Sequence, residues 1–267
     1  MHTPVLSDAE FALLRDWVQA EAGISLSSAK KPLVTSRLLK RVSQLGLASF
    51  GEYHRLVSQG GSHETQTALD LLTTNETYFF REPKHFAFLR ERALPARRAG
   101  SAWRVWSAAC SSGEEPWSIA MTLAEALPAA PWEILASDLS TRVLERARSA
   151  QYPLERAEHI PAPLLKKYCL RGIGSQAGSF CLDRPLRQRV QFRQVNLVQP
   201  LPEVGSFDVV FLRNVLIYFD PATKAQVVRQ LCERLRPGGW FFCGHSESLH
   251  GLDLPLIAEQ PAIYRRQ

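Results

Sequence analysis

The sequence lacks a long apolar run. No stretch of about 18 consecutive apolar residues occurs, which excludes a transmembrane helix and direct insertion into a membrane. Residues 1–8 lack a cationic start followed by an apolar segment, so we expect no signal peptide and a cytoplasmic location. The histidines show no metal-ligand spacing. An odd number of cysteines, with no two of them two residues apart, argues against a disulfide framework and a zinc site: Cys110, Cys169, Cys181, Cys232 and Cys243.

Positive charge is in excess, and it is unevenly distributed. The net charge is +6. Residues 30–41 contain five basic residues and no acidic one, and residues 166–193 contain seven basic residues against one acid, Asp183. Two such patches indicate an acidic macromolecular partner, which could be nucleic acid or an acidic protein surface. Composition alone does not separate these two partners.

Residues 1–90 have the pattern of an all-helical domain. Ser7 and Glu10 form a capping box, and Gly23 ends the helix that they begin. Further helices are predicted at 29–44, from Ser49, at 64–72, and from Pro83. The helix at 29–44 has a basic stripe beside its apolar face, formed by Arg37, Lys40 and Arg41.

Residues 91–267 have the pattern of an α/β domain. Short apolar segments at 103–108, 132–137, 207–212 and 240–244 alternate with helical patterns at 118–127, 141–148 and 223–235. Such alternation predicts a parallel sheet covered by helices on both faces. The segment at about 170–194 interrupts the alternation, holds three glycines, and is predicted to be a small β insertion.

The first predicted strand leads into a loop of small residues, 109–113, and then a helix. Small residues let the backbone approach a ligand closely. Only Gly113 remains of a dinucleotide fingerprint, and Glu114 and Glu115 would repel a pyrophosphate. The same carboxylates favour a cationic ligand such as S-adenosylmethionine. The alternative is an ordinary helix start, where acids are favoured by the helix dipole.

Three other clusters are candidate parts of the same site. Asp138 ends the second strand, where an acid can accept ribose hydroxyls, or it caps the next helix. Residues 75–81 and 212–219 each combine polar and aromatic residues next to predicted elements. Both clusters are also compatible with ordinary loops whose polar groups are satisfied.

These motifs together resemble the chemotaxis receptor methyltransferase (CheR) family over nearly the whole chain. The matching segments are 74–81 (TNETYFFR), 106–116 (WSAACSSGEEP), 136–138 (ASD), 195–197 (VNL), 211–219 (FLRNVLIYF) and 244–247 (GHSE). Cys110 stands where the family often has alanine or glycine, and Ser112 stands where it often has threonine. The resemblance implies a class I (Rossmann-like) methyltransferase domain with an inserted β-subdomain, preceded by an all-helical domain.

The resemblance also implies a cofactor and its site. The cofactor would be S-adenosylmethionine, and the product S-adenosylhomocysteine. Arg81 and Tyr218 would face the reacting methyl group. The residues lining the cofactor site would be Asn75, Thr77, Arg81, Glu115, Asp138, Asn196, Leu197, Arg213 and Asn214.

The acceptor implied by the family is a glutamate side chain of a chemotaxis receptor, converted to a γ-glutamyl methyl ester. A glutamate carboxyl with a pKa near 4.3 is already a nucleophile at neutral pH, so no general base is required. The enzyme's task is alignment. Arg81 is a candidate to orient the carboxylate, because guanidinium groups bind carboxylates through two hydrogen bonds.

The family also implies two contacts with the receptor. The basic stripe would contact the acidic methylated helices of the receptor's cytoplasmic domain. The loop at Gly172, Gly174 and Gly178 resembles one that, in some members, binds a pentapeptide at the receptor C-terminus. Replacing these glycines would block a tight loop.

Two other functions compete with this prediction. One is a methyltransferase of the same fold that acts on RNA or a small molecule, which the pI of about 9.2 favours. No aromatic residues interleave with the basic stripe, so we expect no nucleic-acid partner. The other is a non-catalytic binding module, which would have lost the acid at Glu115 or Asp138; both are present.

Overall fold

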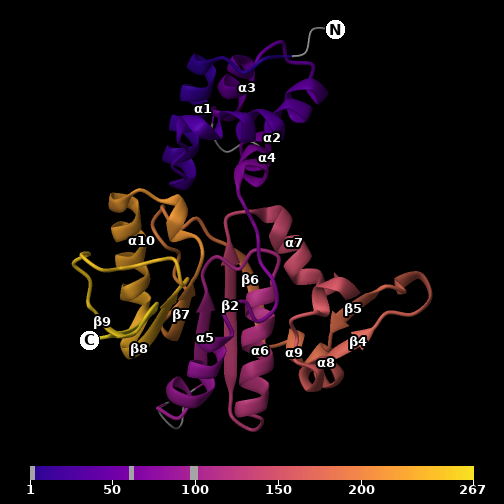
Figure 1. Ribbon diagram of the computed structural model, residues 1–267, viewed down its shortest axis with the longest axis vertical. Helices are drawn as coiled ribbons and strands as arrows, with labels where there is room; N and C mark the ends of the chain where they lie inside the picture. The colour runs from indigo at the N-terminus through magenta and orange to yellow at the C-terminus, as the bar shows by residue number, and fades with distance from the viewer. Residues whose placement is uncertain (1–3, 60–62, 97–101) are drawn as a thin grey trace.

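Two folding units follow one another along the chain in the computed structural model, which describes residues 4–59, 63–96 and 102–267. Figure 1 shows a helical unit at one end, joined by one extended segment to a larger α/β unit. The small β-subdomain projects from one side of the larger unit.

The helical unit consists of α1 (Asp8–Ala22), α2 (Lys31–Gln44), α3 (Phe50–Val57) and α4 (His63–Leu72), with a 3-10 turn at Ser28–Lys30. The predicted capping box is confirmed, because the Ser7 side chain accepts from the backbone of Glu10 and the Glu10 side chain accepts from that of Ser7. Gly23 ends α1 in the left-handed conformation, with φ of 70°. The apolar faces of these helices form a core of their own.

The helical unit ends near Leu72, and the predicted boundary at residue 90 is wrong. Helix α5 (Pro83–Phe88) and the π-helical turn after it (Leu89–Ala93) pack on the sheet of the α/β unit. The Phe88 ring lies 4.9 Å from that of Trp240, centroid to centroid. The periodicity of the sequence correctly predicted that α5 is a helix, but periodicity does not indicate against which hydrophobic core a helix packs.

A seven-stranded sheet forms the α/β unit, with the strand order β6-β2-β1-β7-β8-β10-β9. The first five strands in this order are mutually parallel, whereas β10 is antiparallel to both β8 and β9. The sequence patterns did not indicate β9 or β10. The strands are β1 (Trp103–Ser107), β2 (Trp132–Asp138), β6 (Val190–Gln194), β7 (Phe207–Leu212), β8 (Leu235–Cys243), β9 (Leu256–Gln260) and β10 (Ile263–Arg266).

Helices cover both faces of this sheet, as predicted. Helices α5 and α6 (Glu114–Ala126) pack on the face that carries Val105 and Val209. Helix α10 (Pro221–Arg234) packs on the other face, which carries Trp106 and Val210. The alternation of adjacent residues between two cores follows from the two-residue repeat of a strand. Helix α7 (Thr141–Ser149) packs beside β2 and β6.

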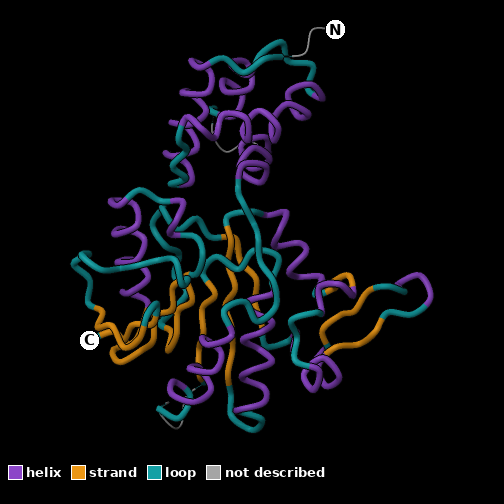
Figure 2. Tube along the Cα trace, in the orientation of Figure 1, coloured by secondary structure: helices purple, strands orange, loops and turns teal. Residues whose placement is uncertain are grey.

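The β-subdomain is a three-stranded antiparallel sheet with the order β3-β5-β4. It contains β3 (Gln151–Pro153), β4 (Cys169–Arg171) and β5 (Ser179–Leu182), with α8 (Ala162–Tyr168), α9 (Arg184–Arg187) and a 3-10 turn at Leu154–Ala157. Figure 2 shows its strands apart from the main sheet. The predicted insertion is therefore misplaced: it begins near residue 151, and β6, within the predicted 170–194, is an edge strand of the main sheet.

All five cysteines are free thiols, and Cys110, Cys232 and Cys243 are buried. Within the described ranges, no helix is long and apolar enough to cross a membrane.

Candidate active site

A cavity of about 380 Å³ lies beyond the carboxyl ends of β1, β2 and β7. Strand β1 has β2 on one side and β7 on the other, so the direction in which strands are added reverses there. Ligands of open α/β sheets bind at such a switch point. Ile24, Leu26 and Leu33 of the helical unit also line the cavity, so both units contribute to it.

The structure brings together all of the residues that the family resemblance assigned to the cofactor and the methyl group. They come from five separate stretches of sequence and line this one cavity: Asn75, Thr77, Arg81, Glu115, Asp138, Asn196, Leu197, Arg213, Asn214 and Tyr218. The basic stripe and the glycine loop are not among its lining residues.

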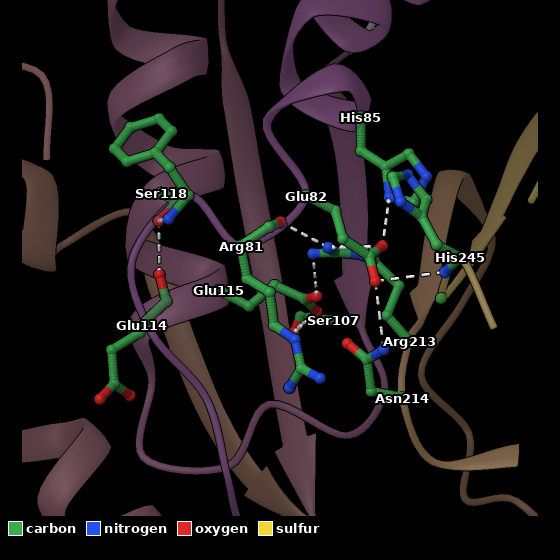
Figure 3. A network of polar contacts seen from close by, with 12 residues as sticks. Arg81, Glu82, His85, Ser107, Glu114, Glu115, Ser118, Arg213, Asn214 and His245 are labelled. Atoms are coloured by element: carbon green, nitrogen blue, oxygen red, sulfur yellow. Dashed lines mark hydrogen bonds and ion pairs between the residues drawn. The ribbon is translucent and has the colours of Figure 1, made fainter. Parts of the chain in front are cut away.

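Of the two glutamates that begin α6, Glu115 faces the cavity and Glu114 does not. The Glu115 carboxylate accepts hydrogen bonds from Ser107 Oγ at 2.7 Å and from Arg213 Nη1 at 2.8 Å. Burial raises the pKa of Glu115, although Arg213 opposes this shift. Glu114 accepts from Ser112 Oγ at 2.6 Å, and in Figure 3 its carboxylate points away from Glu115. The expectation that both acids face a cationic ligand is therefore wrong for Glu114.

The loop before α6 is shaped by Gly113 and held by Asp138. Gly113 has φ of 99°, and an added Cβ would lie 2.8 Å from Tyr152 Oη and 2.9 Å from Ala147 Cβ. Asp138 accepts from the backbone N–H of Ser111 at 2.8 Å and of Ser140 at 2.9 Å. Ser140, rather than Asp138, caps α7 with its side chain. Burial raises the pKa of Asp138.

Arg81 is a half-buried residue of the cavity wall. Its guanidinium donates to the backbone oxygen of Glu76 at 2.8 Å and lies 5.8 Å from the Tyr78 ring centroid. The residues on either side of it, Phe80 and Glu82, have φ of 54° and 58°. Non-glycine residues rarely adopt this left-handed conformation, and its occurrence at two positions marks a strained segment.

A buried ion-pair network that sequence reasoning missed lies behind Arg81 (Figure 3). Arg213 pairs with Glu115 at 2.8 Å and with Glu82 at 2.9 Å. Glu82 also accepts from Asn214 Nδ2 and from the backbone N–H of His245, each at 3.2 Å. Burial opposes ionisation of Glu82, but Arg213 and these donors outweigh it and lower the pKa of Glu82 to about 2. Glu82 and His245 lie in or beside the recognised motifs, yet nothing in the sequence indicated that they meet.

Three side chains in the same network are of residue types that commonly bind metal ions. Glu82, His85 and His245 place possible ligand atoms within 4.8 Å of one another. Burial lowers the pKa of His85 to about 3. However, the oxygens of Glu82 already accept from three N–H donors, and one of these is the cation of Arg213. The group is therefore better described as an ion-pair network than as a metal centre.

The helical unit closes one side of the cavity through contacts with the cavity wall. Asn196 Nδ2 donates to the backbone oxygen of Glu21 at 2.7 Å. Ser25 N donates to the backbone oxygen of Tyr218 at 2.8 Å, and Ile24 forms an isolated antiparallel bridge with Phe219.

Two of the three cations in the predicted basic stripe are engaged within the protein. Arg37 donates to the backbone oxygens of Leu72 and Thr73 at 2.6 and 3.2 Å, so it holds the segment that joins the two units. Arg41 pairs with Glu64. Lys40 is exposed. Arg37 and Arg41 are half-buried, so Lys40 is the most accessible of the three cations, and the contact of this stripe with a receptor stays a prediction.

Comparison with known proteins identifies relatives of the chain along nearly its full length. Residues 9–73 match the CheR methyltransferase all-alpha domain, and residues 75–260 match the CheR methyltransferase SAM binding domain. The boundary between these two matches lies where the structure places it, just after α4.

Curated relatives have the same name in several bacteria. The chain is 41% identical to the chemotaxis protein methyltransferase of Escherichia coli K12, covering 97% of this chain and 91% of the relative. It is 45% identical to chemotaxis protein methyltransferase 2 of Pseudomonas aeruginosa, covering 90% and 86%. It is 43% identical to the chemotaxis protein methyltransferase of Salmonella typhimurium, covering 92% and 86%.

Proposed function

This chain belongs to the CheR methyltransferase family, and on that premise we propose how its site carries out the family's reaction. The protein is an S-adenosylmethionine-dependent methyltransferase that methylates glutamate side chains of chemotaxis receptors. The relatives give no support to RNA or a small molecule as the acceptor. The observation that carries the proposal is the cavity at the switch point, where all the residues assigned to the cofactor and the methyl group meet.

The cavity fits S-adenosylmethionine in size and charge. Its volume of about 380 Å³ is in the range of cofactor sites, roughly 300–1,000 Å³. Each Asp138 oxygen accepts one backbone N–H, which leaves a lone pair for a ribose hydroxyl. Glu115 would hold the cationic end of the cofactor, whereas Arg81 is available to its carboxylate or to the acceptor.

When bound, S-adenosylmethionine supplies an electrophilic methyl group carried on a sulfonium. The protein holds and orients the acceptor, whose carboxylate is already ionised at neutral pH. Arg81 would orient that carboxylate, and Tyr218, on the 3-10 turn Leu216–Tyr218, would border the same space. The helical unit closes over this side of the cavity, which restricts access of water.

The reaction is tested by incubating the protein with labelled S-adenosylmethionine and candidate receptor cytoplasmic domains. We expect label in base-labile methyl esters on glutamate. A receptor domain in which the candidate glutamates are replaced by alanine is the control. Label that resists base, or that enters RNA instead, would contradict the proposed acceptor.

The β-subdomain would supply a second, tethering contact with the receptor. Strand β4 is the last strand of the small sheet in the described part of the chain, so one of its edges is unpaired there. Leu170 and Ile173 beside this edge are 59% and 84% exposed. A peptide that adds a strand to a sheet edge gains main-chain hydrogen bonds, and flanking apolar side chains supply specificity. Binding there would raise the local enzyme concentration near the methylation helices.

The glycine loop between β4 and β5 maintains the backbone conformation next to this edge. Gly174 and Gly178 have φ of 56° and 86°, and an added Cβ at Gly172 would lie 2.0 Å from the Gln176 backbone oxygen. All three glycines are therefore required by backbone geometry or by close packing.

Calorimetric titration with pentapeptides copied from receptor tails tests the tether. We expect binding with or without cofactor, and loss of binding when Gly174 and Gly178 are both replaced by valine. Gly251→Val is a matched control, because Gly251 also has positive φ and open space around it. If no receptor tail of the source organism binds at millimolar concentration, the tether is wrong.

A further inference from the structure

Arg81 lies in a backbone segment that is strained on both sides. Phe80 before it and Glu82 after it both have positive φ, and neither is a glycine. Residues in this conformation persist only where surrounding contacts hold them, and such strain collects at functional sites. The contacts that hold this segment therefore determine the position of the Arg81 backbone, from which the side chain extends.

On each side of Arg81, a set of side-chain hydrogen bonds, here termed a hold, fixes the backbone of the segment. On the amino side, the Phe80 N–H donates to Ser118 Oγ at 2.9 Å, and the Ser118 hydroxyl itself donates to the Glu114 backbone oxygen. On the carboxyl side, the Glu82 carboxylate is held by Arg213 Nη2 at 2.9 Å and by Asn214 Nδ2 at 3.2 Å. Figure 3 shows these two holds on either side of Arg81.

Arg213 completes the hold, because the same guanidinium group also donates to the Arg81 backbone oxygen. Its other amino group pairs with Glu115 in the cavity wall. The side chain of Arg213 is 2% exposed and that of Glu82 is 12% exposed, so solvent competes little for this pair.

The Arg81 guanidinium takes no part in the network. It donates to the Glu76 backbone oxygen and reaches the cavity on its own. Glu82 therefore acts on Arg81 through the backbone, not through contact between the two side chains.

We propose that Glu82 is a positioning residue, which holds the backbone of Arg81 so that its guanidinium meets the acceptor carboxylate in the productive place. The inference rests on the proposed orienting function of Arg81. It assigns to the acid directly after Arg81 a role in the rate of transfer, distinct from binding the cofactor or the receptor.

A double-mutant cycle with Arg81→Ala tests this role. Glu82→Gln keeps the shape of the side chain and removes its charge. We expect it to lower kcat by about tenfold to a hundredfold, the scale of a small misplacement, and to change the receptor KM much less. In the Arg81→Ala background, the same change should have little further effect, because residues that act through one another are not additive.

Two further variants make the cycle decisive. Ser118→Ala removes the hold on the amino side and should show the same dependence on Arg81. Asp208→Asn is the matched control, because Asp208 is a mostly buried acid paired with Arg236 at the opposite end of β7. Its effect on kcat should be small and equal in both backgrounds. If Glu82→Gln lowers kcat by the same factor with and without Arg81, the positioning role is wrong.

Hydrogen exchange separates this inference from the proposed reaction. If the parent protein makes no methyl ester, the proposed acceptor fails, but exchange of the backbone amides at 78–82, which precede Pro83, still reports on the hold. We expect faster exchange in Glu82→Gln and in Ser118→Ala, and unchanged exchange in Asp208→Asn. Unchanged exchange in both of the first two variants would also overturn the inference.

Discussion

Replacing Asp138 by alanine should weaken binding of S-adenosylmethionine and S-adenosylhomocysteine alike. The change removes the proposed acceptor of the ribose hydroxyls, and hydrogen bonds to a charged group contribute about 1.5–3 kcal/mol. That loss corresponds to a roughly 10- to 150-fold rise in Kd. The variant also leaves the buried N–H groups of Ser111 and Ser140 without their acceptor. Each such group costs about 1–3 kcal/mol of stability, so Tm should fall by several degrees.

Calorimetry with both ligands, together with thermal unfolding without ligand, checks this prediction. Asp183→Ala is the matched control, because Asp183 also accepts a backbone N–H, that of Leu186, but caps α9 in the β-subdomain. The control should lose some stability and keep its affinity for both ligands. Unchanged affinity in Asp138→Ala would remove Asp138 from the ribose site. A weakened affinity for only one of the two ligands would place it near the methyl group instead.

Three further predictions concern catalysis, docking and pH. Arg81→Ala should reduce methyl transfer more than cofactor affinity; transfer at the parent rate with cofactor bound would disprove its orienting role. Lys40→Glu should raise the receptor KM at low salt without changing Tm. Arg37→Glu should instead lower Tm, because Arg37 holds the segment between the two units. Equal KM values for the parent and Lys40→Glu would show that Lys40 is merely solvated. The folded-state pKa of Glu82, about 2, lies below its ordinary value of 4.5, so its ionisation stabilises the fold above about pH 4.5 and this contribution is lost as pH falls towards 2. Urea unfolding across that window should therefore show the stability difference between parent and Glu82→Gln shrinking with falling pH, and a constant difference would contradict the assignment.

Elements with strong local signals were predicted closely. The strand at 207–212 has the predicted bounds, and Asp138 ends β2 as expected. The Ser7–Glu10 capping box formed because its partners are three residues apart, so the pattern that predicts the contact is also the one that makes it.

Short elements, and elements whose pattern would suit either of two parts of the fold, were predicted less well. Strands β3 and β4 have three residues each, too few for an alternating pattern to stand out. The sequence pattern also did not separate β6, at the edge of the main sheet, from the β-subdomain that precedes it. Helix α5 was assigned to the wrong unit, because its apolar face would suit either core.

The sequence by itself determined the two kinds of domain, the order of the motifs and, through the family that they resemble, the cofactor and the residues that line the cavity. These properties depend on local periodicity and residue identity, which are readable along the chain. The tertiary structure decided which charges remain free. Arg37 and Arg41 are engaged by groups on α4 and the segment after it, and Glu114 is turned away from the cavity. It also decided that Glu82 meets Arg213, 131 residues further along the chain, because contacts at that separation form only when the sheet and its helices pack together.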